Sequence, residues 1–69
     1  MSEAEIIINN IREIIDEKGY LKNKVAARSG FSEKQFSAIL NGKKTLKASY
    51  IPAIAKALGV EPNALFRNA

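Results

Sequence analysis

The side chains best suited to bind a ligand are the lysines and arginines in the middle of the chain. Residues 18–47 contain eight basic residues and one acidic residue, so this segment has a net charge of +7. Residues 1–17 contain five acidic residues and one basic residue, and the whole chain carries +4. This concentration of positive charge favours a polyanionic partner, nucleic acid before a membrane surface. A solvated lysine-rich surface is the alternative, and charge alone favours the two interpretations equally.

The residues of common catalytic and metal sites are missing from the sequence. The 69-residue chain has no cysteine and no histidine. This composition excludes a zinc site with the usual ligands, a Ser-His-Asp triad and a Cys-His dyad. Glu13, Asp16 and Glu17 have the residue type of paired catalytic carboxylates, but no partner base accompanies them, and a solvated helix face is the better interpretation. We therefore expect no enzymatic activity, no cofactor, no metal and no small-molecule site.

Length and hydropathy predict one domain over residues 1–69. Hydrophobic residues make up 46% of the chain and charged residues 26%, as in ordinary globular domains. The longest apolar run is Ile6-Ile7-Ile8, whereas a membrane span needs about 20 residues. The chain begins Met-Ser-Glu-Ala-Glu, which is acidic where a secretory signal is basic. We expect a cytoplasmic protein that does not contact membranes.

Hydrophobic periodicity predicts an all-α fold. Apolar residues recur at helical spacing, and no alternating run reaches the length of a strand. Single glycines at positions 19, 30, 42 and 59 each follow an apolar-periodic stretch, where helix C-caps occur. We expect a compact five-helix domain with helices at about 3–18, 22–29, 33–40 and 49–58 and a last short helix that starts at Pro62.

Capping residues and apolar stripes support these helices. Ser2 and Glu5 have the spacing of a capping box, and Ser32 and Gln35 repeat it before the third helix. The residues expected to face the core are, helix by helix, Ile7, Ile8, Ile11, Ile14 and Ile15; Leu21, Val25 and Ala26; Phe36, Ile39 and Leu40; Ile51, Ile54, Ala55 and Leu58; and Leu65 and Phe66. The acidic side chains of the first helix then lie on its outer face.

Residues 22–41 have the pattern of a helix-turn-helix. Two helices of about eight residues are joined by a short turn, in which Gly30 supplies a left-handed backbone at low cost. Ala26 is small where the two helices must approach each other. Phe31 and Phe36 are bulky apolar residues that wedge the second helix across the first.

The whole sequence resembles the DNA-binding domain of the phage lambda repressor and Cro type, the xenobiotic-response-element class of bacterial regulators. The resemblance covers about residues 4–66 and is carried by Val25-Ala26-Ala27-Arg28-Ser29-Gly30-Phe31-Ser32, Ile39-Leu40-Asn41-Gly42-Lys43-Lys44, Ile54-Ala55-Lys56-Ala57-Leu58-Gly59-Val60 and Leu65-Phe66. It implies a transcriptional regulator that binds duplex DNA, most simply a phage- or prophage-type repressor that occupies an operator.

The sequence departs from this family at the start of the second helix. Leu21-Lys22 stands where the family usually has Thr-Gln, so the usual cap is lost and Asn23 is an alternative cap. Lys22 still offers a phosphate donor, now charged. Ser29 replaces an apolar residue, and Leu46 stands where many members have proline. None of these changes removes a part that the fold needs.

The third helix is the expected reader of DNA bases. With about 100° of rotation per residue, Lys34 and Ala38 lie opposite the face that carries Phe36, Ser37 lies on the flank, and Glu33 stands at the exposed start. The resemblance implies that these positions enter the major groove, which assigns base contacts to Glu33, Lys34, Ser37 and Ala38. Stabilisation of the helix N-terminus is an equal alternative for Glu33, and a plain solvent-facing role is the alternative for Ser37 and Ala38.

Phosphate contacts are expected on both sides of this helix. Lys22 lies at the start of the second helix, where backbone N–H groups point outward. The resemblance adds Ser32, Asn41, Lys43 and Lys44, which match backbone-contacting positions of the family, and it leaves a base contact open for Lys44.

The small size of a single helix-turn-helix motif suggests that the protein assembles as a dimer. A single helix-turn-helix covers few base pairs, so we expect a palindromic operator and a homodimer that is weak in solution and forms mainly on DNA. Val60 and Phe66 are the candidate interface residues, with Ile6 and Leu46 as further apolar residues.

The rival function is a protein-interaction module or antitoxin that uses the same fold, with DNA binding secondary. The basic middle segment favours DNA, because an interaction module does not need it.

Overall fold

The computed structural model describes residues 2–67, and the regular elements over that range are all helices. Its elements are α1 (Glu3–Lys18), α2 (Lys22–Ser29), α3 (Glu33–Leu40), α4 (Tyr50–Leu58) and the 3₁₀ helix η1 (Pro62–Phe66). The expected all-α fold is therefore present, with four α-helices. The fifth expected helix is a single 3₁₀ segment of five residues.

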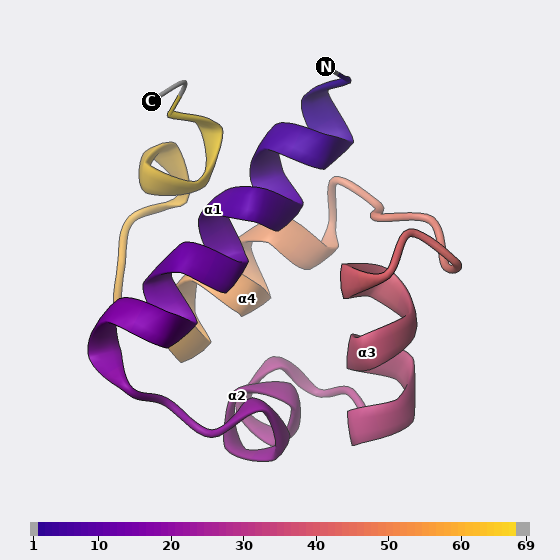
Figure 1. Cartoon of the computed structure of the whole chain (residues 1–69), viewed down its shortest axis with the longest axis vertical. Helices are drawn as coiled ribbons and strands as arrows, with labels where there is room; N and C mark the ends of the chain where they lie inside the picture. The colour runs from indigo at the N-terminus through magenta and orange to yellow at the C-terminus, as the bar shows by residue number, and fades with distance from the viewer. Residues whose placement is uncertain (1, 68–69) are drawn as a thin grey trace.

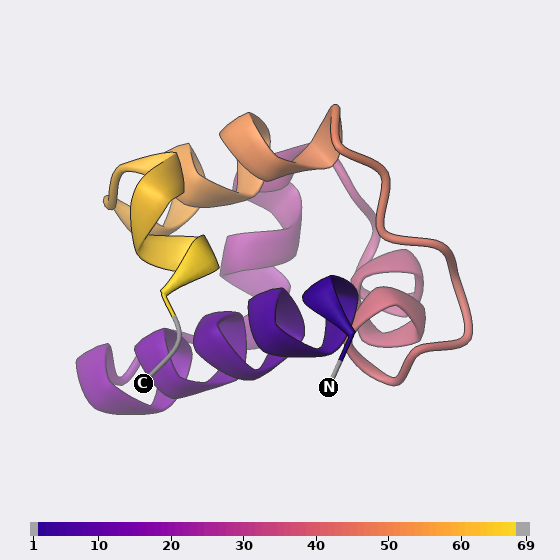
Figure 2. The same ribbon diagram turned by 90° about the horizontal axis from the view of Figure 1, so that it is seen from above.

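The elements surround one core (Figures 1 and 2). α2 packs on α4 and α3, and η1 packs on α1 and α4. Both views place α3 at one side of the molecule and η1 at the opposite side. The buried apolar residues come from every element: Ile7, Ile11, Ile15, Val25, Ala26, Phe36, Ile39, Leu40, Ile51, Ile54, Ala55, Ala57, Leu58 and Leu65. α3 is thus anchored on its inner side and leaves its outer side open.

Local sequence signals explain the helix ends. The Ser2 hydroxyl accepts a hydrogen bond from the Glu5 backbone N–H at 3.2 Å, while the Glu5 carboxylate accepts from that hydroxyl at 3.3 Å. Gly19 ends α1 in the left-handed conformation, with φ of 69°. Pro52 lies in the first turn of α4, where its missing N–H has no helical acceptor to lose.

Two residues expected in the core are exposed instead. Leu21 is the N-cap of α2 and is 60% exposed, because it lies before the first turn and the buried residues of α2 begin only at Val25. The prediction that it faces inward is therefore wrong, and Asn23 is not the cap because it already lies inside the helix. Phe66 is 46% exposed at the end of η1, where only Leu65 is buried.

A long connection of residues 41–49 separates α3 from α4, and it projects beyond α3 in Figure 2. The ring of Phe31, in the turn between α2 and α3, meets the ring of Tyr50 edge to face, with centroids 4.8 Å apart. The Lys47 ammonium lies 6.0 Å from the centre of the Tyr50 ring. These contacts hold the end of the connection that leads into α4 against the turn between α2 and α3.

Within residues 2–67, none of the helices has the length and apolar composition that crossing a membrane requires.

Candidate nucleic-acid interface

The outer side of α3 carries the side chains expected to read bases. Glu33 and Lys34 are exposed, and Ser37 and Ala38 are half-buried. The opposite side of the helix buries Phe36, which is 1% exposed. The structure therefore places all four expected residues off the core, with the first turn of α3 the most accessible part.

The start of α3 is held by a complete capping box. The Ser32 hydroxyl oxygen accepts from the Gln35 backbone N–H at 3.1 Å, and the Gln35 Oε1 accepts from the Ser32 backbone N–H at 3.0 Å. These two bonds confirm the capping box expected from the sequence. The hydroxyl proton of Ser32 is not used in either bond, so this exposed side chain keeps a donor for an anion.

The start of α2 is built differently. Its N-cap residue, Leu21, makes no side-chain cap hydrogen bond. The first N–H groups of a helix have no acceptor within the helix, so they remain available to solvent or to an anion. Lys22, the first residue of α2, is exposed beside them.

The chain after α3 folds back on the last turn of that helix. Gly42 adopts φ of 74°, a left-handed conformation that allows the reversal. The Ala38 carbonyl then accepts from the backbone N–H groups of Lys43 at 2.9 Å and Lys44 at 3.1 Å. Lys43 is exposed and Lys44 is half-buried. Both lysines are thereby fixed near the C-terminal end of α3.

A residue that the sequence did not single out also reaches this end. Arg12 of α1 donates from Nη2 to the Leu40 carbonyl at 2.9 Å and to Asn41 Oδ1 at 3.1 Å. The one available signal was that Arg12 is the lone basic residue among the acidic residues of the first 17. Asn41 itself is exposed and is the C-cap of α3.

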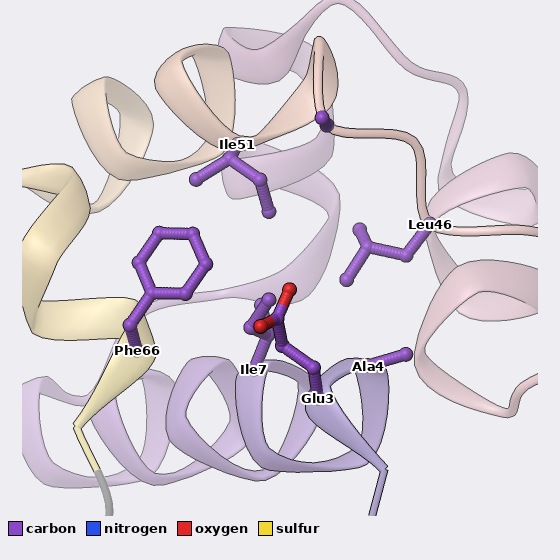
Figure 3. Close-up of a pocket in the computed structure, with 7 residues that line it drawn as sticks. Glu3, Ala4, Ile7, Leu46, Ile51 and Phe66 are labelled. Carbon is purple, nitrogen blue, oxygen red and sulfur yellow. The ribbon is translucent and has the colours of Figure 1, made fainter.

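The expected dimer residues lie apart from this region. Phe66 lines a small open cavity of about 170 Å³ together with Glu3, Ala4, Ile7, Leu46, Ala48 and Ile51 (Figure 3). Val60 is half-buried, packs against the core and lines a different surface hollow with Glu61, Asn63, Ala64 and Arg67. Phe66 and Val60 thus line two different hollows in the described part of the chain.

Residues 2–67 contain no group of three or more His, Cys, Asp or Glu residues placed to hold a metal ion. In the same range, every buried side-chain nitrogen or oxygen has a hydrogen-bond partner. The buried Ser29 is one example, because its hydroxyl donates to the Val25 carbonyl at 2.8 Å. The polar groups open to a ligand are therefore at the surface, and many of them flank α3.

Two short helices joined by a glycine turn, with the second one exposed on its outer side, define the class of this fold. A family described as the helix-turn-helix domain matches residues 8–69. The chain belongs to this family. Its membership confirms the resemblance to the DNA-binding regulators of the lambda-repressor and Cro type, and the elements of the motif are α2 and α3.

This helix-turn-helix domain also has a similar solved structure. The crystal structure of NHTF, a hypothetical transcription factor from Neisseria, superposes with a TM-score of 0.84 and 24% sequence identity. The match covers 96% of this chain and 76% of that one. At this level of identity the similarity shows the fold. No curated protein matches the sequence.

Proposed function

We propose that this helix-turn-helix domain binds double-stranded DNA at specific sequences and represses transcription in the manner of a phage or prophage repressor. The observation that carries the proposal is the position of α3, whose open side lies between anion donors at its start and at its end. The major groove of B-DNA is wide enough to admit an α-helix such as α3. We also propose that the protein is located in the cytoplasm, where a bacterial or phage operator would be found.

The roles along α3 follow from exposure and chemistry. Lys34 is the main base reader, because its ammonium donates to O6 and N7 of guanine. Glu33 accepts from cytosine N4, and the Ala38 methyl contacts a thymine methyl. Ser37 is half-buried, so its hydroxyl reads only a base that approaches closely.

Phosphate contacts fix the orientation of the helix in the groove. On one side, Lys22 and the hydroxyl of Ser32 donate to phosphate oxygens. On the other side, Asn41 and Lys43 donate from the turn after α3, and Lys44 joins them. Because both ends of α3 are clamped in this way, its register on the bases is determined by groups that carry no sequence information themselves.

We also propose that two copies bind a palindromic operator. Phe66 is half exposed beside the open cavity that contains Leu46 and Glu3, and a two-fold contact would place this surface of each copy against the same surface of the other. An apolar patch of this size is small compared with the roughly 1,200–2,000 Å² of stable interfaces, so the dimer forms mainly on DNA. Sedimentation of the protein with and without operator tests this proposal, and one protomer per full palindrome at saturation contradicts it.

Equilibrium binding to duplex DNA at a series of salt concentrations tests the function. A preferred site is first selected from a random duplex pool. With roughly four to six phosphate contacts per monomer, log affinity should fall with log salt at a slope of about −4 to −5, at about −0.9 per phosphate. A flat salt response or a failure to enrich any sequence contradicts the proposal and favours a protein-interaction module.

Two lysine variants form a matched pair in this experiment. Lys34→Ala should cost about 1–3 kcal/mol on the selected site and less on random DNA, because it removes a base contact. Lys43→Ala should weaken all sequences alike and reduce the slope by about one. If Lys34→Ala lost the same affinity on the selected site and on random DNA, Lys34 would be a phosphate contact only.

A further inference from the structure

Arg12 links the first helix to the end of the third. Its guanidinium donates to the carbonyl of Leu40, the last residue of α3, and to the side-chain oxygen of Asn41, the C-cap. The carbonyls of the last helical turn have no donor within the helix, and a positive charge there is favourable. One arginine therefore satisfies a helix end and holds a neighbouring side chain at the same time.

The second bond determines which way the Asn41 amide points. An asparagine side chain has an oxygen that accepts and a nitrogen that donates, whereas a guanidinium can only donate. Arg12 must therefore face the oxygen of Asn41. The Nδ2 group lies on the other branch of the amide and is left as a donor for an anion. Without Arg12, both orientations of the amide are open.

The same turn of α3 fixes the neighbouring lysines. The Ala38 carbonyl accepts from the backbone N–H groups of Lys43 and Lys44. Asn41, Lys43 and Lys44 thus share one scaffold, the C-terminal end of α3, and Arg12 is the contact from α1 that holds it.

We propose that Arg12 is a positioning residue for DNA binding, which turns the Asn41 Nδ2 group outward as a phosphate donor and holds the end of α3 in place. The proposal rests on the proposed DNA-binding function. In this proposal Arg12 acts through Asn41 and not through a phosphate contact of its own, although only its Nη2 group is used in the bonds to Leu40 and Asn41; the salt slope of Arg12→Ala distinguishes the two roles.

Lys18 provides a matched control on the same helix. Its ammonium donates to the carbonyl of Leu58, the last residue of α4, at 3.4 Å. Lys18→Ala therefore removes the same charge from α1 and a contact of the same kind, but at the end of a helix that does not read DNA. A general effect of charge or of helix-end stabilisation should appear equally in Lys18→Ala and Arg12→Ala.

The experiment is a double-mutant cycle of Arg12→Ala and Asn41→Ala in the full chain, with affinity measured on the selected duplex and on random duplex. Each single variant should lose about fivefold to tenfold on both kinds of DNA, the effect of about one hydrogen bond. The double variant should lose no more than either single variant. The salt slope should stay unchanged in Arg12→Ala, and Lys18→Ala should bind within twofold of the unmodified protein.

Three outcomes overturn the proposal. Additive losses in the cycle would show that Arg12 and Asn41 act independently. A slope reduced by about one in Arg12→Ala would show that Arg12 contacts a phosphate directly. Equal losses in Arg12→Ala and Lys18→Ala would show a general effect of charge.

Failure of the function itself gives a different result. In that case the unmodified protein shows no salt-dependent duplex binding, and both proposals fall together. Circular dichroism checks that each variant is folded. If Arg12→Ala unfolds, the cycle is repeated with Arg12→Met, which keeps an unbranched apolar side chain but has no donor, and the same criteria of non-additivity and unchanged slope apply.

Discussion

α2 and α3 are both eight residues long, but different interactions fix them. α3 has a complete capping box and buries the large side chain of Phe36, together with Ile39 and Leu40. α2 has no side-chain cap, and its buried residues are the smaller Val25, Ala26 and Ser29. α3 thus combines a local cap with large buried anchors, whereas α2 depends on the packing of smaller residues against α4 and α3.

The difference suits the tasks that we propose for the two helices. α3 must keep its shape although one side is open, and its cap and its large anchors provide this. α2 lies between α3 and α4, so its own end can stay open to an anion. Its one buried polar residue, Ser29, is satisfied within the helix by the Val25 carbonyl. Variants that change the buried side chains and the caps of the two helices separately test this comparison.

The largest effect is expected from Phe36→Ala. Removing a fully buried aromatic side chain leaves a cavity and should lower the free energy of unfolding by about 3–5 kcal/mol, a large part of the stability of a domain this small. Urea unfolding followed by circular dichroism measures it. Leu21→Ala is the control, because this residue is 60% exposed and should change stability by less than about 0.5 kcal/mol. A loss below about 1 kcal/mol for Phe36→Ala would show that α3 is not anchored in this way.

A smaller effect is expected from Ala26→Leu. Ala26 is fully buried where α2 meets its neighbours, and the larger side chain should cost about 1–3 kcal/mol through overpacking. The neighbouring Ala27 is exposed, and Ala27→Leu should be close to neutral because leucine and alanine have similar helix propensities. Thermal unfolding of the two variants compares them, and equal stabilities would contradict a tight approach at Ala26.

The smallest effects are expected from exchanging the caps. Ser32→Ala should cost about 1 kcal/mol, because α3 loses its side-chain acceptor. Leu21→Thr should gain about 0.5–1 kcal/mol, since the backbone at residue 21 already has the extended conformation of an N-cap and lacks only the hydroxyl. Thermal unfolding measures both changes. A loss of stability in Leu21→Thr would mean that the exposed leucine side chain contributes more than a cap.

The same contrast explains how far the sequence predicts the structure. The expected ranges 3–18, 22–29 and 33–40 agree with α1, α2 and α3, because Ser2 and Ser32 mark the starts of α1 and α3, and Gly19 and Gly30 mark the ends of α1 and α2. The prediction for Leu21 failed at the helix without a cap, where no local signal defines the first inward residue. The last element was expected to be a short helix, and the five residues Pro62–Phe66 form a 3₁₀ helix and not an α-helix.

The candidate interface also contains residues that the sequence predicts and a contact that it does not predict. The exposed side of α3 follows from helical periodicity, so the positions of Glu33 and Lys34 were predictable. The link from Arg12 to Asn41 spans 29 residues and depends on where α1 passes the end of α3. No spacing rule relates residues on helices that are far apart in sequence, so only the fold reveals this contact.

Asn10 joins α1 to the last element of the described chain. Its Nδ2 group donates to the carbonyls of Leu65 and Arg67, both at 2.8 Å, and Leu65 is fully buried. These bonds close a loop of 55 residues or more, so they form after the local helical contacts during folding. η1 contributes only Leu65 to the core, so this short unit is expected to open more easily than α4, and its amides should exchange with solvent at a lower free energy. When that unit detaches it also removes Phe66 from its place, which makes the proposed two-fold contact sensitive to partial unfolding.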